Sequence, residues 1–236
     1  MDDVELLQPW STFVMRTKLQ PEVLEEMLKI TDEILSGKQN HTSWGSNLAG
    51  QIEDEYRIDR RHLPTNVTTY LHEALQQFVR LQLLQSSPYP NPHDIDAHHK
   101  RRQEVLKGDI STELLALWVV SQKDNEYNPI HLHTECMVSA VMYLKIPEYL
   151  PSKKAHRDDD GAICFSGMTP QDHYFVNDIV MNIKPQVGDF FVFPSSQQHQ
   201  VYPFQTKDGK SERRSVSLNA NFNSNIRRKY EEETSR

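Results

Sequence analysis

The chain has little of what several classes of protein require. Two cysteines, Cys136 and Cys164, are too few for a disulfide scaffold and suit a reducing cytoplasm. The longest apolar run, residues 114–120, is far shorter than the roughly 20 residues that cross a bilayer. Residues 1–5 lack the basic start and apolar stretch of a signal peptide. We therefore expect a cytoplasmic protein that has no membrane partner.

The charge pattern argues against nucleic acid as a partner. The formal net charge is −7, and the basic runs at residues 100–102 and 227–229 are short. A protein that follows a phosphate backbone needs a more extended basic surface. The length of 236 residues fits one domain, and a hydrophobic content of 37% is sufficient for its core.

The first third of the chain shows helical periodicity. Apolar residues recur at helical spacing over residues 21–36, with a proline at the start and a glycine after the end. A second such stripe covers residues 65–85. Residues 89–109 are charged and predict an exposed loop, with a short helix near 100–106.

The second half predicts short strands instead. They are expected at residues 114–120, 137–146, 179–183, 189–193 and 213–222, separated by Pro, Gly and Asp. Strands without intervening helices favour an antiparallel sandwich or barrel, so the whole chain predicts an α+β domain. Within it, residues 1–110 form a helical support region, 111–225 the β core and 226–236 a charged tail.

Three side chains in the second half form a candidate metal site. Alternate residues of a strand share a face, so His133 and Glu135 point the same way if the expected strand extends back to them. His131 has the same parity and competes for the role of first ligand. His199 follows the aromatic strand at 189–193 and supplies a second imidazole. Two imidazoles and one carboxylate form the facial triad of non-haem iron oxygenases.

An arginine pair beyond this site suggests that an anion binds nearby. Strand alternation places Arg213 and Ser215 on one face and Arg214 on the other. A buried guanidinium needs an anion, and its planar fork matches a carboxylate with two hydrogen bonds. We expect Arg213 to face inward, and Arg214 remains the alternative.

In these residues the chain resembles a known family. The order His133-Thr134-Glu135, His199 and Arg213-Arg214-Ser215 is similar to the His-x-Asp/Glu, His and Arg-x-Ser motifs of 2-oxoglutarate/Fe(II)-dependent oxygenases. Residues 128–133, 139–144, 188–195 and 213–219 resemble conserved stretches of the prolyl-hydroxylase-like members. The resemblance covers roughly residues 112–222, and the helical first third is similar only in type.

The resemblance implies a fold and a metal. The fold is a double-stranded β-helix, a jelly-roll or cupin-like barrel, with the N-terminal helices packed on one sheet. The metal is Fe(II), held by His133, Glu135 and His199. Many members have Asp where this chain has Glu135, and the choice between His131 and His133 stays open.

The resemblance also implies a reaction. Arg213 would bind the distal carboxylate of 2-oxoglutarate, with help from Ser215 and Tyr143. The enzyme would use O2 to hydroxylate a C–H bond and would convert 2-oxoglutarate to succinate. The primary substrate is open, because either a peptide side chain or a small metabolite fits these residues.

Two other functions compete with this hypothesis. A cupin would bind a metal through His131, His133 and His199 without 2-oxoglutarate, and a non-catalytic interaction domain would keep the barrel alone. The ligand-rich segments at 93–99 and 156–161 are interpreted as a solvated loop and a turn. The insertion at 148–176 is long for a sheet connection and is a candidate substrate lid.

Overall fold

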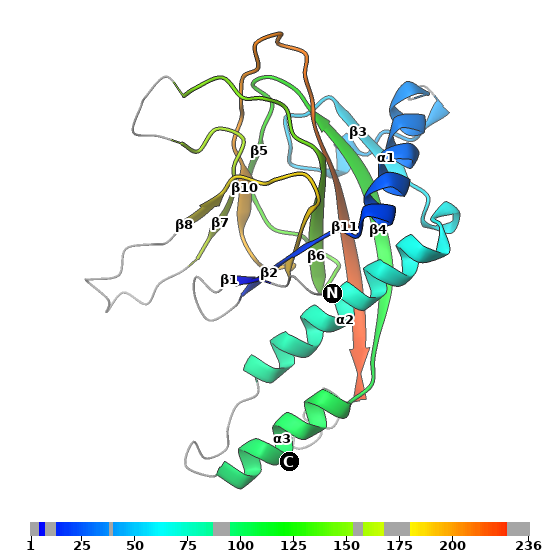
Figure 1. The fold of residues 1–236 in the computed structure, drawn as a ribbon, viewed down its shortest axis with the longest axis vertical. Helices are drawn as coiled ribbons and strands as arrows, with labels where there is room; N and C mark the ends of the chain where they lie inside the picture. The colour runs from blue at the N-terminus through cyan, green and yellow to red at the C-terminus, as the bar shows by residue number, and fades with distance from the viewer. Residues whose placement is uncertain are drawn as a thin grey trace, which may run out of the picture.

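Two antiparallel sheets and a layer of helices make up the protein. The structure is a computed structural model, and it describes residues 5–7, 13–37, 40–86, 95–152, 158–167 and 180–225. The larger sheet has seven strands in the order β1-β2-β9-β6-β11-β4-β3, and the smaller has four in the order β5-β10-β7-β8. Figure 1 shows the helices α1 and α2 on one side of the larger sheet and the smaller sheet on the other.

The bounds of the elements follow the sequence pattern closely in the second half. The larger sheet contains β1 (Glu5–Leu7), β2 (Val14–Lys18), β3 (Asp54–Ile58), β4 (Ile110–Gln122), β6 (Val138–Lys145), β9 (Asp189–Pro194) and β11 (Arg213–Ser224). The smaller contains β5 (Asn128–His131), β7 (Ile163–Ser166), β8 (Val180–Ile183) and β10 (His199–Val201). All five predicted strands are confirmed, although β4 is longer than expected.

The described residues also form three α-helices and two short 3-10 helices. They are α1 (Pro21–Ser36), α2 (Thr65–Ser86), α3 (Ile95–Lys107), η2 (Gly45–Asn47) and η3 (Arg60–His62). Pro21 sits at the first turn of α1, where its missing N–H has no intrahelical partner to lose. The buried face of α1 repeats at helical spacing and consists of Val23, Met27, Thr31 and Ile34.

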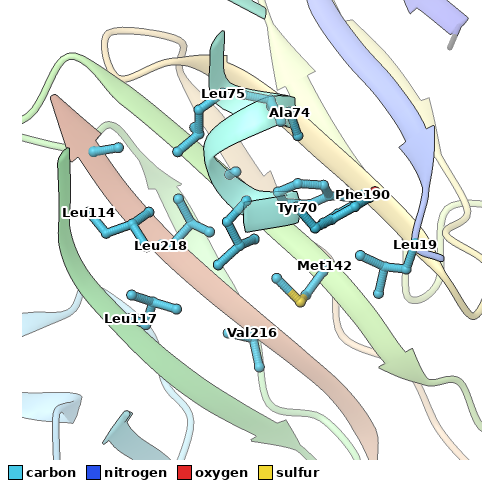
Figure 2. Packing of buried hydrophobic residues seen from close by; sticks show 14 of the residues in the cluster. Leu19, Tyr70, Ala74, Leu75, Leu114, Leu117, Met142, Phe190, Val216 and Leu218 are labelled. Carbon is cyan, nitrogen blue, oxygen red and sulfur yellow. The ribbon is translucent and has the colours of Figure 1, made fainter. Parts of the chain in front are cut away.

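The main core lies between these helices and the larger sheet. In Figure 2, Tyr70, Ala74 and Leu75 of α2 lie over Leu114 of β4 and Leu218 of β11. All five side chains are at most 5% exposed. A second apolar cluster lies between the two sheets, and it contains Val141, Tyr143, Ile163, Phe165, Phe191 and Phe193 among others. The larger sheet is therefore buried on both faces.

The periodicity predicted a helical first third of the chain, but the structure also contains strands in this region. β2 pairs with β9 and β3 pairs with β4, so residues from this region extend the larger sheet on both sides. Such short strands carry little pattern of their own, and their pairing with distant strands decides their conformation. The charged segment expected to be mainly loop contains α3, and β7 falls inside the insertion at 148–176.

Several expectations fall on residues that the structure leaves out. Residues 153–157 and 168–179 of the candidate lid and the tail at 226–236 lie outside the described residues. Cys136 and Cys164 are both free thiols. Among the described helices, none is long and apolar enough to span a membrane.

Candidate metal centre

A pocket of about 470 Å³ opens between the two sheets. Its lining contains the predicted ligands His133, Glu135 and His199 together with His131. Arg213, Ser215 and Tyr143, predicted to bind the co-substrate, line the same pocket. Side chains that are up to about 80 residues apart in the sequence therefore meet in one cavity.

Three histidines converge in this pocket. One ring nitrogen from each of His131, His133 and His199 lies within 4.8 Å of the others. His131 ends β5 and pairs directly with His199 at the start of β10, so two of the three come from adjacent strands. His133 follows two residues after β5, and its ring stacks on that of His199 with a centroid separation of 5.2 Å. The three imidazoles offer donors to a single ion.

Hydrogen bonds fix the same ring orientation in all three histidines. His131 Nδ1 lies 2.7 Å from the Pro129 carbonyl oxygen, and His199 Nδ1 lies 2.9 Å from that of Gln197. His133 Nδ1 lies 2.7 Å from Asn219 Oδ1, which also accepts a hydrogen bond from Ser139. Because each neighbour is an acceptor, each Nδ1 carries the proton. Each Nε2 then has a free lone pair for a metal, the arrangement that metal-binding histidines favour.

Burial keeps these imidazoles neutral. Desolvation lowers the pKa of His131, and it lowers the pKa of His133 to about 4. Desolvation also places the pKa of His199 well below its usual value, with the neighbouring histidines adding to the effect. A neutral imidazole is the form that binds a metal ion, so the site is ready for a ligand without losing protons.

Glu135 does not join the histidines. The nitrogens of the three imidazoles lie within 4.8 Å of one another, and no Glu135 oxygen lies within that distance of all three. Its φ is +59°, in the left-handed region, and its side chain is exposed at the pocket lining. The prediction that His133 and Glu135 share a face of one strand is wrong, because β5 ends at His131 and β6 begins only at Val138. Strand alternation does not extend through this bend.

Backbone contacts hold the segment between β5 and β6 against the end of β9. The His133 N–H donates to the Ser195 carbonyl at 3.0 Å, and the Ser195 N–H donates to the Met137 carbonyl at 3.2 Å. The Ser195 hydroxyl adds a bond to the Cys136 carbonyl at 2.7 Å. Trp118 of β4 stacks on the His133 ring with a centroid separation of 5.9 Å. Both the backbone and the ring of His133 are thus fixed.

Arg213 is buried in the same pocket without an anionic partner. Its side chain is 2% exposed, and it donates to the Gly161 carbonyl at 2.7 Å and to the Gln122 amide oxygen. Its Nε has no hydrogen-bond partner, and no carboxylate among the described residues forms an ion pair with it. The guanidinium also lies 5.4 Å from the centre of the Tyr143 ring. A buried cation with only neutral partners is costly unless an anion binds.

Arg214 lies on the opposite face of β11. It donates to Asp32 of α1 and to Glu212, each at 2.5 Å. Strand alternation predicted the inward position of Arg213, and the pocket lining contains Arg213 but not Arg214. Arg214 instead ties β11 to α1.

The residues around Arg213 are those that a carboxylate site needs. Ser215 is two residues further along the same face of β11, and Tyr143 lies on the neighbouring strand β6. Burial raises the pKa of Tyr143 to about 12, so its hydroxyl stays a hydrogen-bond donor. Gly161, which accepts the Arg213 bond, has a φ of +71°, and a Cβ there would lie 2.5 Å from the Tyr149 ring. Only glycine fits that turn.

Sequence reasoning missed three residues of this site, and two of them, Glu55 and Asn219, line the pocket. Glu55 of β3 lines it, although the sequence placed no strand there. Gln122 and Asn219 orient Arg213 and His133 through their amide oxygens. Strand alternation puts Asn219 on the same face of β11 as Arg213, and this was the available signal for one of the three. Gln122 and Glu55 are revealed only by strand pairing.

Comparison with known proteins agrees with this geometry. Residues 116–219 match the family model described as "Putative 2OG-Fe(II) oxygenase". The resemblance predicted from the motifs is thereby confirmed. Members of this family use Fe(II), 2-oxoglutarate and O2, the three cofactors expected from the sequence. No curated protein sequence matches the chain.

Solved structures share the fold. AviO1 from Streptomyces viridochromogenes is 11% identical, with 88% of each chain covered and a TM-score of 0.51. SnoN, a non-heme alpha-ketoglutarate-dependent epimerase of nogalamycin biosynthesis, is 14% identical over 88% of this chain and 76% of its own, with a TM-score of 0.50. A Pseudomonas putida prolyl-4-hydroxylase is 18% identical over 87% and 91%, with a TM-score of 0.46. At these identities the first two comparisons establish the oxygenase fold alone.

Proposed function

We propose that this protein is a 2-oxoglutarate- and Fe(II)-dependent dioxygenase that hydroxylates a C–H bond of its primary substrate. The observation that carries the proposal is the convergence of three histidine ring nitrogens in a pocket that also contains a buried arginine with no anionic partner among the described residues. The three histidines suit a divalent metal ion, and the arginine suits a carboxylate. A cupin-type metal enzyme explains the histidines, but it leaves Arg213 unexplained.

We assign His131, His133 and His199 as the metal ligands, in place of the triad with Glu135. Imidazole is a good ligand for ferrous iron, and the hydrogen bond of each Nδ1 leaves the Nε2 of that ring available to a metal. Three neutral ligands leave the charge of the ion uncompensated, which favours an anionic co-substrate nearby. When bound, Fe(II) supplies the O2 chemistry that couples decarboxylation of 2-oxoglutarate to hydroxylation.

The chain's own residues position the co-substrate and exclude water. Arg213 binds the distal carboxylate of 2-oxoglutarate, with Ser215 and Tyr143 as further donors. Val141 and Ile163 supply apolar lining to the same pocket. Such walls strengthen the electrostatic contacts inside the pocket by removing solvent.

An anaerobic titration with Fe(II) and 2-oxoglutarate tests this assignment. The bound pair should give a weak visible charge-transfer band, and the protein should convert 2-oxoglutarate to succinate in air. We expect His131→Ala and His199→Ala each to abolish the band, because a ligand is lost. Glu135→Gln should retain it. Loss of the band in Glu135→Gln with retention in His131→Ala would restore the triad predicted from sequence.

A further inference from the structure

Glu55 is a buried acid without a partner inside the pocket. Its side chain is 1% exposed, and neither carboxylate oxygen has a hydrogen-bond partner among the described residues. It pairs in register with Val120 of β4, whose side chain also lines the pocket, so both side chains lie on that face of the sheet. A buried carboxylate left unpaired is costly, and proteins retain such groups mainly where a ligand completes them.

The segment before β3 forms the wall around this carboxylate. The Trp44 N–H donates to the Glu55 carbonyl at 2.8 Å, which fixes the start of η2 against β3. A Cβ on Gly45 would lie 3.5 Å from Glu55 Oε2, and one on Gly50 would lie 3.6 Å from Oε1. Backbone without side chains therefore approaches both oxygens, and the pocket provides the remaining access.

The nearest candidate for an internal partner is engaged elsewhere. Arg57 is two residues further along β3, but its guanidinium lies over the Trp44 ring at 5.0 Å. No ion pair between Arg57 and Glu55 is present in the described structure, and the Arg57 side chain is exposed. Glu126, the other nearby charge, is acidic and repels the carboxylate.

The charged residues that line the pocket differ in the ligand charge that they complement. Apart from the histidines, its charged lining residues are Arg213, Glu55 and Glu135. Arg213 is the cation that an anionic co-substrate needs, and the two other ionisable groups, Glu55 and Glu135, are both carboxyl groups. Trp44 and Trp118 also line the pocket, and aromatic faces attract cations, as the Arg57 guanidinium over the Trp44 ring illustrates. These residues complement a positive charge.

We propose that Glu55 binds a positively charged nitrogen of the primary substrate, an ammonium or guanidinium group, and thereby selects basic compounds. The hydroxylation of such a compound rests on the proposed function above, whereas the cation site itself does not. β3 lies two strands from β11, or roughly 10 Å across the sheet. The cation site is thus separate from the carboxylate site that we assign to Arg213 of β11.

The test uses small cations and their neutral counterparts on the metal-free protein. The probes are n-butylammonium and methylguanidinium, matched with n-butanol and N-methylurea, and the signal is tryptophan fluorescence from Trp44 and Trp118. We expect saturable binding of the cations, weakened by about tenfold or more in Glu55→Gln. The neutral probes should give no saturable change. Glu53→Gln is the matched control, because Glu53 is exposed and carries the same charge two residues away.

The outcomes separate this inference from the proposed function. Equal binding of the cations to wild type and Glu55→Gln, or equal binding of neutral and charged probes to wild type, overturns the inference. The second comparison holds even if Glu55→Gln fails to fold. Turnover of 2-oxoglutarate to succinate is measured separately. Cation binding that depends on Glu55 without any such turnover would reject the oxygenase and leave the cation site standing.

Discussion

Buried charged side chains are paired on the helix side of the larger sheet and unpaired in the pocket on its other side. On the helix side, Arg214 is 4% exposed and lies between Asp32 and Glu212. On the pocket side, the adjacent Arg213 is 2% exposed and has only neutral partners, and Glu55 has none among the described residues. Charges that stabilise a fold are paired within it. Charges that remain unpaired at similar burial are available for ligands.

The carboxyl groups on the two sides differ in the same way. Burial raises the pKa of Glu212, but hydrogen bonds from Ser121 and Arg214 outweigh this effect and the net shift is downward. A hydrogen bond from Arg214 lowers the pKa of Asp32. For Glu55, burial and the nearby Glu126 both act in one direction and raise the pKa to about 7.

The largest expected effect concerns the stability cost of Glu55. Its folded-state pKa of about 7 lies above the ordinary value of 4.5 for a glutamate, so the folded protein holds this proton more tightly than the unfolded chain. Ionisation of the Glu55 carboxyl group therefore lowers the free energy of unfolding as the pH rises from about 4.5 to about 7. Above about pH 8 the full loss is on the order of 3 kcal/mol. Glu55→Gln should be more stable than wild type at about pH 8 and similar to it near pH 4.5.

Urea denaturation at several pH values measures this difference. Glu53→Gln, which changes an exposed carboxyl, should follow the wild type throughout. A destabilised Glu55→Gln variant at high pH would mean that the carboxylate has a partner in the folded protein, and the contrast between the two sides of the sheet would fail.

The next effect separates the two arginines by ligand affinity. Arg213→Met removes the guanidinium that we assign to the distal carboxylate of 2-oxoglutarate, so affinity should fall by about a hundredfold. Binding of Fe(II) and the free energy of unfolding should change little, because no anion is left behind. Titration followed by the charge-transfer band gives both affinities. Unchanged 2-oxoglutarate affinity would move the carboxylate site away from Arg213.

The smallest expected effect is the loss of stability when Arg214, on the helix side of the sheet, is replaced. Arg214→Met removes the cation closest to Asp32 and a hydrogen-bond donor to the half-buried Glu212, so the free energy of unfolding should fall by about 2 kcal/mol. This is below the cost for a fully buried pair, since the Asp32 side chain is 57% exposed. The affinity for 2-oxoglutarate should stay at the wild-type value. A large loss of that affinity would show that the two faces are not independent.

Local pattern predicted much of the architecture. The helical stripe gave the bounds of α1, and the stripe of α2 was one residue short at its end. Alternation along β11 correctly separated Arg213 from Arg214, because side-chain direction in a long regular strand depends only on position parity. The order of the motifs also predicted the resemblance to the oxygenase family model that residues 116–219 match, since the spacing of site residues along the chain is a property of the sequence itself.

Only the tertiary structure decided which groups meet. The bend at Glu135 interrupts the parity on which the predicted triad depended, and the pairing of β5 with β10 brings His131 beside His199 instead. Glu55 is buried because β3 pairs with β4, a contact between segments about 65 residues apart that no local pattern records. Periodicity reports the direction of a side chain within its own element. Partners across the sheet depend on long-range pairing, whose energy comes from contacts that a single segment does not contain.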